Sequence, residues 1–172
     1  MLYPNAKVSA YNKKDTLTLK FGPSTAATLE RMQRAALPYD VHFSWDGLTG
    51  STLDSHKLIL LASDVLGPKE LGTFIYALFD GSLCHGHDIS DRRGFLLPLA
   101  VIYGLGDSME GVEGLLDGEE MKRRVEEEMG RAREEVGVTA VPSYVVNGRW
   151  KVGGFQEMGV WTRLLERIRG EK

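Results

Sequence analysis

Apolar residues recur at helical spacing through most of the middle of the chain. Residues 54–137 predict almost continuous helix, in which glycine and proline residues separate the successive segments. One helix has a core face that stops at Gly67, and Pro68 fits the first turn of the next helix. Further helices are expected from Asp88 or Ser90 to Tyr103, over residues 109–116 and over residues 119–136.

The first part of the chain mixes strand and helix signals. Residues 16–21 alternate polar and apolar side chains, which favours a strand, but they could equally end a helix near Gly22. Residues 24–36 carry one apolar stripe of a helix. Residues 41–45 alternate again before the turn signal Asp46-Gly47, which predicts a short strand.

The clearest hairpin signal lies near the C-terminus. Asn147-Gly148 separates two β-rich segments, residues 144–146 and 149–152. Both central residues of a type I′ turn need a positive φ, and this dipeptide is the one that best tolerates it. An amphipathic helix over residues 158–168 is expected to follow the hairpin.

Composition narrows the class of protein. The net charge of −3 gives no electrostatic reason to expect nucleic acid or an anionic membrane as a partner. No apolar run approaches the roughly 18 residues that a membrane span needs, and the first residues lack the features of a signal peptide. One cysteine in 172 residues excludes an internal disulfide or a dithiol centre within them. We therefore expect a soluble, cytoplasmic protein.

Several segments together resemble one known family. Residues 137–148 read GVTAVPSYVVNG and resemble the G-V-x-G-V-P-x-F-x-[IV]-[DN]-G segment of thioredoxin-fold proteins of the DsbA superfamily, with Ala140 and Tyr144 as the departures. Four further segments resemble the FrnE-type branch of that superfamily in the same order along the chain: residues 20–23, 52–58, 88–91 and 153–156.

The resemblance implies an α-rich α+β fold. We expect a truncated thioredoxin-like fold with an all-helical insertion. Its three expected parts, within one compact unit, are residues 1–53, 54–137 and 138–172. Members of the family open with a strand and a helix that carry Cys-x-x-Cys. No such motif occurs here, and residues 3–6 correspond to the segment after the second strand of the family. We therefore expect a member without the first βα unit and its dithiol.

The resemblance also points to binding residues near the hairpin. Pro142 would be the cis-proline of the family, which leaves the Val141 backbone free to pair with an extended substrate. Spacing alone favours a trans proline that starts a strand. Gln156 stands where kappa-class relatives bind the γ-glutamyl carboxylate of glutathione, although a plain helix cap fits it equally.

Candidate catalytic groups lie in two places. His56 begins a helix that approaches the active site in the related family, so it is a candidate acid or base near pH 7. Its alternative is a structural bond to a nearby backbone group. Asp54 and Tyr144 are further polar groups of the expected cleft. Cys84-His85-Gly86-His87 offers three possible metal ligands too close together, so we expect a solvated loop and no metal.

Three functions remain open. The first is a protein of the DsbA-like oxidoreductase family that has lost dithiol catalysis. The second is an isomerase or transferase that acts on a small aromatic or glutathione-linked substrate without redox chemistry. The third is a non-catalytic binding module. No cofactor is expected other than glutathione, and the small sheet, with its open edges, predicts a homodimer.

Overall fold

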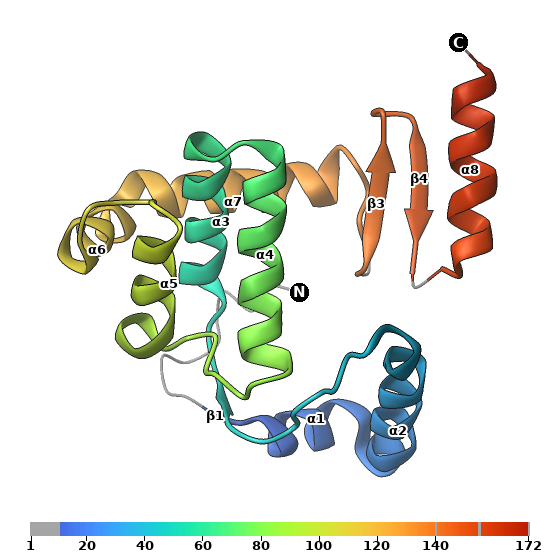
Figure 1. Ribbon diagram of the computed structural model, residues 1–172, viewed down its shortest axis with the longest axis horizontal. Coiled ribbons are helices and arrows are strands. Elements are labelled where there is room, and N and C mark those ends of the chain that lie inside the picture. The colour runs from blue at the N-terminus through green and yellow to red at the C-terminus, as the bar shows by residue number, and fades with distance from the viewer. Residues whose placement is uncertain (1–10, 140, 155, 172) are drawn as a thin grey trace. The chain divides into compact units, whose positions relative to one another are not determined.

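The computed structural model describes residues 11–139, 141–154 and 156–171, and helices make up most of it (Figure 1). The chain forms two compact units, Leu2–Glu126 and Glu127–Lys172. The α-rich α+β class expected from the sequence is confirmed. The three-part division of the chain stays a prediction. Ala140 and residues 3–6, used above in the family comparison, lie outside the described residues.

The first unit opens with a two-residue strand, β1 (Tyr11–Asn12), and helix α1 (Lys13–Phe21). The side chain of Asn12 accepts hydrogen bonds from the backbone N–H groups of Lys14 (2.9 Å) and Asp15 (3.3 Å), which caps α1. Residues 16–21 are therefore helical, and the helical alternative is the one confirmed. Two short 3₁₀ turns flank the next helix: η1 (Gly22–Ser24), α2 (Thr25–Ala36) and η2 (Leu37–Tyr39).

The strand predicted at residues 41–45 is wrong. This segment has no regular structure, and the partner of β1 is β2 (Leu48–Thr49) instead. Other parts of the unit bind the backbone of the segment: Phe43 N–H donates to the side-chain oxygen of Gln33 (2.8 Å), and Ser44 N–H donates to the carbonyl of Leu83 (2.7 Å). A segment whose backbone groups bond a side chain and a helix end has no need of a sheet partner.

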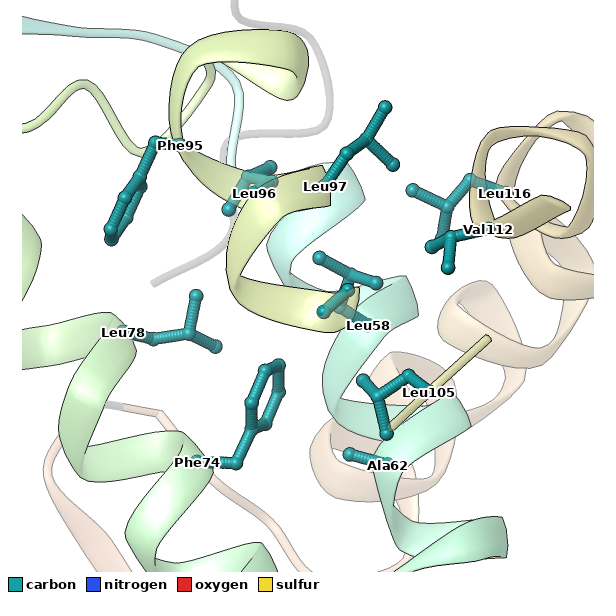
Figure 2. Close-up of a cluster of buried hydrophobic side chains, with 11 residues drawn as sticks. Leu58, Ala62, Phe74, Leu78, Phe95, Leu96, Leu97, Leu105, Val112 and Leu116 are labelled. Carbon is teal, nitrogen blue, oxygen red and sulfur yellow. The ribbon is translucent and has the colours of Figure 1, made fainter. Parts of the chain in front are cut away.

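Four helices of the first unit enclose its hydrophobic core: α3 (Leu53–Val65), α4 (Pro68–Leu83), α5 (Leu97–Ile102) and α6 (Met109–Asp117). Leu58 of α3 lies at the centre, and Phe74 and Leu78 of α4 reach it from one side (Figure 2). The side chain of Phe79, on the same helix, is 56% exposed. Phe74 and Leu78 are four residues apart and therefore lie on the same face of α4, which packs into the core. Phe79 lies on a different face of the helix.

A π-helical turn, η3 (Arg92–Leu96), precedes α5. Asp91 begins it, because its carboxylate accepts the backbone N–H of Gly94 (2.8 Å). The cap therefore lies one residue beyond the positions expected from the sequence. Pro98 is the second residue of α5, directly after the last hydrogen bond of the π-helical turn, from Leu97 N–H to the carbonyl of Arg92. Gly104, with φ of 72°, lies just beyond the end of α5.

Two buried lysines bind the C-terminal ends of helices. The ammonium of Lys13 donates to the carbonyl of Ser82 in the last turn of α4, and the ammonium of Lys57 donates to the carbonyl of Leu116 in the last turn of α6 (2.6 Å). The last carbonyls of a helix lack partners within it and carry partial negative charge. Each lysine thus neutralises a helix end that the core has taken out of water.

The second unit contains the predicted hairpin. It begins within α7 (Glu119–Glu134) and continues with β3 (Ser143–Val146) and β4 (Trp150–Gly153), which pair antiparallel. Asn147 (φ 52°) and Gly148 (φ 68°) form the turn, closed by a hydrogen bond from Arg149 N–H to the carbonyl of Val146 (3.1 Å). The hairpin and its turn are confirmed.

Helix α8 (Met158–Gly170) packs against one face of the hairpin. Tyr144 meets Trp161 edge to face, with ring centroids 4.9 Å apart, and the guanidinium of Arg167 lies 4.5 Å from the ring of Trp150. Successive residues of a strand point to opposite faces. Ser143 and Val145 therefore point away from α8.

No helix in the described part of the chain has both the length and the apolar character to cross a membrane.

Two glycines of α4 provide a test of the core packing. An added Cβ at Gly81 would lie 2.5 Å from Cζ of the buried Phe95, whereas an added Cβ at Gly72 meets nothing within 4 Å. We expect Gly81→Ala to lower the free energy of unfolding by about 1–3 kcal/mol through overpacking. Gly72→Ala should raise it by about 0.5–1 kcal/mol through helix propensity. Urea unfolding of the two variants measures both; equal effects would contradict this packing.

Candidate functional site

His56 lies in the first turns of α3. Its Nδ1 is 2.7 Å from the carbonyl oxygen of Thr52, which also accepts the backbone N–H of His56 (3.1 Å). A carbonyl only accepts, so Nδ1 carries the proton and Nε2 carries a lone pair in the neutral ring. Burial lowers the pKa of His56, and the hydrogen bond to Thr52 offsets part of that effect. The ring is therefore a neutral base whose Nε2 bonds no other described residue.

Asp54 is engaged elsewhere. Its Oδ2 accepts from Nε of Arg92 at 2.9 Å, and its Oδ1 lies 3.7 Å from Nζ of Lys57. Positions two apart point to different sides of a helix, so Asp54 does not orient the ring of His56. The carboxylates of Asp54 and Asp117 both raise the pKa of Arg92, which stays charged at any working pH.

A pocket of about 240 Å³ opens beside the start of α3. Asp54 is the one predicted site residue that lines it, together with a buried lysine, an arginine, two serines and a leucine: Lys57, Arg92, Ser51, Ser90 and Leu53. These five were not predicted from the sequence. Lys57 could have been identified from the sequence, because it interrupts the apolar face of α3 directly before Leu58. A lysine buried there needs a hydrogen-bond or ion-pair partner. Arg92 gave none, since its partners are distant in sequence.

The proline loop lies in the second unit. The Val141–Pro142 peptide is cis, and Val141 is 56% exposed. The carbonyl of Pro142 accepts the backbone N–H of Gly154 (2.8 Å), which ties the loop to the end of β4. The backbone of Val141 bonds no other described residue. Its N–H and carbonyl are therefore available to an extended partner.

Gln156 lies next to the same loop. Its side-chain amide donates to the carbonyl of Gly153 (2.6 Å), the residue that pairs with Ser143 across the hairpin. Helix α8 begins only at Met158, with Glu157 as the preceding cap position and no side-chain capping bond. Gln156 therefore neither caps nor starts the helix. The structure brings Val141, Pro142 and Gln156 to one end of the hairpin.

Tyr144 packs on Trp161, on the hairpin face that α8 covers. This places it at a structural contact within the second unit. Tyr144 thus belongs with Val141, Pro142 and Gln156, while Asp54 and His56 belong to the first unit. The predicted residues form two candidate sites, one in each unit.

Cys84 follows the last residue of α4. Burial and the neighbouring carboxylate of Asp80 raise the pKa of its thiol, so the thiol is protonated at neutral pH and a weak nucleophile. His85 pairs with Asp80 (3.1 Å), and His87 stacks on Phe95 with ring centroids 4.8 Å apart. Among the residues that the structure places, no cluster of three or more His, Cys, Asp or Glu side chains could hold a metal ion.

Comparison with protein families matches the DSBA-like thioredoxin domain over residues 2–165. The chain belongs to this family. The match spans both units, so the first unit is part of the family's domain as well as the hairpin. Comparison with curated proteins finds no matching relative.

The lowered pKa of His56 predicts a pH dependence of stability. The unfolded chain binds the proton near the ordinary value of 6.5, and the folded chain binds it only at lower pH. The stabilisation from a neutral His56 is therefore complete above pH 6.5 and is lost as the pH falls toward the folded value. We expect His56→Gln to weaken this loss on acidification, measured by urea unfolding at pH 8 and pH 5.

The matched control is His42→Gln, since the side chain of His42 is 70% exposed. An unchanged pH dependence in His56→Gln, or the same change in His42→Gln, would contradict the burial of a neutral imidazole.

Proposed function

We propose that this DSBA-like protein is a FrnE-type member whose 172 residues do not catalyse dithiol–disulfide exchange. One observation carries the proposal: the single thiol, Cys84, sits at the end of α4 with its pKa raised. The exchange reaction needs a reactive thiolate and a second thiol that resolves the mixed disulfide. Cys84 provides neither, and the family's first βα unit with Cys-x-x-Cys is not among these residues.

The proline loop supports a binding role that survives without the dithiol. Val141, at the start of the hairpin, offers a backbone N–H and carbonyl that bond no other described residue, and Gln156 lies beside them. An extended peptide adds to such an edge by main-chain hydrogen bonds. The proposed ligand is a thiol peptide of glutathione type, bound by Val141, Pro142 and Gln156 in the cytoplasm.

A second candidate function is isomerase or transferase chemistry on a small aromatic or glutathione-linked substrate. His56 favours it, because its neutral imidazole has an Nε2 that bonds no other residue in the described part of the chain and can accept a proton. The hydroxyl of Thr52, four residues earlier, is buried and has no hydrogen-bond partner among the described residues. A substrate that donates to His56 and bonds Thr52 would satisfy both groups.

The hairpin favours a third candidate function, a non-catalytic homodimer. Helix α8 covers one face of the hairpin, and Val145 on the other face is 41% exposed. Lys151 lies on the same face, and its ammonium donates to the carbonyl of Val136 (2.5 Å). A two-stranded sheet is nevertheless marginal in water and tends to pair with another chain. We propose that a second copy of the chain covers this face.

The insulin-reduction assay tests the central part of the proposal. With dithiothreitol as the reductant, we expect the wild-type chain to precipitate insulin no faster than dithiothreitol alone. Cys84→Ser should behave identically, because the Cys84 thiol takes no part. A thioredoxin-fold protein with an intact Cys-x-x-Cys is the positive control. A rate above background that Cys84→Ser abolishes would show that Cys84 is a working redox thiol.

A further inference from the structure

The pocket beside α3 is built from groups of opposite charge that come from separate elements. Asp54 and Lys57 belong to α3, Arg92 to η3, and Ser51 and Ser90 to the segments that precede these two helices. Asp54 bonds Nε of Arg92, and Asp117 bonds Nη1 of the same guanidinium (2.6 Å). Glu113 also lies 4.0 Å from Nη1, so the guanidinium is fixed at the pocket by two hydrogen-bonded carboxylates and a third, more distant one.

Hydrogen-bond donors outnumber acceptors in this pocket. Nη2 of Arg92 bonds no other described residue. The ammonium of Lys57, only 6% exposed, has three N–H groups and one hydrogen-bonded acceptor, the carbonyl of Leu116, with Asp54 farther away at 3.7 Å. The Ser51 hydroxyl oxygen accepts the N–H of Leu53 (3.3 Å), which leaves its own O–H to donate.

The available acceptors are few. Asp54 uses Oδ2 on Arg92, and its Oδ1 faces the ammonium of Lys57 at 3.7 Å. Ser90 donates its hydroxyl to Asp88 (2.7 Å), so that only the Ser90 oxygen remains as an acceptor. The lining itself carries two cations, Lys57 and Arg92, and the carboxylate of Asp54, while Asp117 and Glu113 pair with Arg92 from outside the lining. A ligand that fits such a lining accepts hydrogen bonds and carries negative charge.

We propose that this pocket binds the carboxylate of a small aliphatic acid, held by Arg92, Lys57 and Ser51. Nη2 of Arg92 can donate a charge-assisted hydrogen bond to such a carboxylate, while Nε and Nη1 stay bonded to Asp54 and Asp117. Leu53 provides an apolar wall for the rest of the ligand. The volume of about 240 Å³ lies below the roughly 300–1,000 Å³ of sites for drug-sized molecules, which limits the ligand to a few carbon atoms. This site is independent of the proline loop and of the proposed thiol ligand.

Butyrate and its neutral analogue butyramide are the probes for this site. In a titration of the full chain at constant ionic strength, followed by backbone amide NMR, butyrate should shift the resonances of residues 51–57 and 90–92 saturably. Butyramide should not, because it lacks the charge that Arg92 and Lys57 recognise. The absence of saturable shifts with butyrate, or equal shifts with butyramide, would overturn the proposal.

Variants separate a binding site from a purely structural ion-pair network. Arg92→Gln should weaken butyrate binding by about tenfold or more, the effect of losing a charge-assisted hydrogen bond. Arg124→Gln is the matched control, since Arg124 pairs with Asp64 of α3 away from the pocket (2.6 Å), and it should bind butyrate like the wild type. Unchanged affinity in Arg92→Gln would show that Arg92 only joins helices.

Ser51→Ala covers the case in which Arg92→Gln does not fold. It removes one donor from the pocket rim and leaves the ion pairs of Arg92 and Lys57 in place. We expect a severalfold weaker affinity for butyrate, and wild-type affinity in Ser63→Ala, a serine of α3 whose hydroxyl bonds the carbonyl of Leu60 outside the pocket (2.7 Å). Wild-type affinity in Ser51→Ala would contradict its assigned role.

Discussion

The burial of Leu58 among the helices of the first unit is the contact on which the rest of this unit depends. Its side chain is fully buried together with side chains from α4, η3, α5 and α6 (Figure 2). Burying a leucine stabilises the folded state by about 1.5–3 kcal/mol, and the other buried side chains of the cluster add contributions of their own. Because Leu58 lies one turn beyond Asp54 on α3, the same packing holds the first turn of α3 in place. His56 and the pocket beside Asp54 are therefore supported by a rigid core.

The core also explains why charged groups sit at its edge. Lys57 directly precedes Leu58 on α3 and is buried with it. Its ammonium donates a hydrogen bond to the carbonyl of Leu116. Arg92 joins Asp54 to Asp117 and so connects the start of α3 to the end of α6. A buried charge without such partners would cost several kcal/mol. Packing and ion pairing thus fix the same residues that line the pocket.

The second unit is built differently. None of its described residues between 127 and 171 is buried, although the hairpin and α8 are well formed. Aromatic contacts of Tyr144 with Trp161, and of Trp150 with Arg167, hold α8 to one face of the hairpin. On the other face, the ammonium of Lys151 donates to the carbonyl of Val136 (2.5 Å), and no aromatic contact is found there among the described residues of this unit. A unit without buried side chains gains little hydrophobic stabilisation of its own, which is the physical reason to expect a partner.

Short sequence patterns correctly predicted the features that depend on local backbone conformation. Asn147-Gly148 fixed the hairpin because few other residues tolerate its φ angles, and Gly67-Pro68 marked the border of two helices. The strand at residues 41–45 failed, since the alternation of side chains does not reveal that Gln33 and Leu83 bond the backbone. Asp54 and His56 were identified from sequence, but the pairing of Asp54 with Arg92, 38 residues away, depends on tertiary packing that no local pattern shows.

Light scattering coupled to size exclusion tests most directly whether the hairpin face opposite α8 joins two chains. We expect a mass near twice the 19.1 kDa of the chain, and a shift toward the single-chain mass in Val145→Glu, which places a charge on that face. Leu19→Glu, at an exposed position of α1, is the control and should retain the wild-type mass. A wild-type protein that stays at 19.1 kDa at every concentration would contradict a dimer joined at this face.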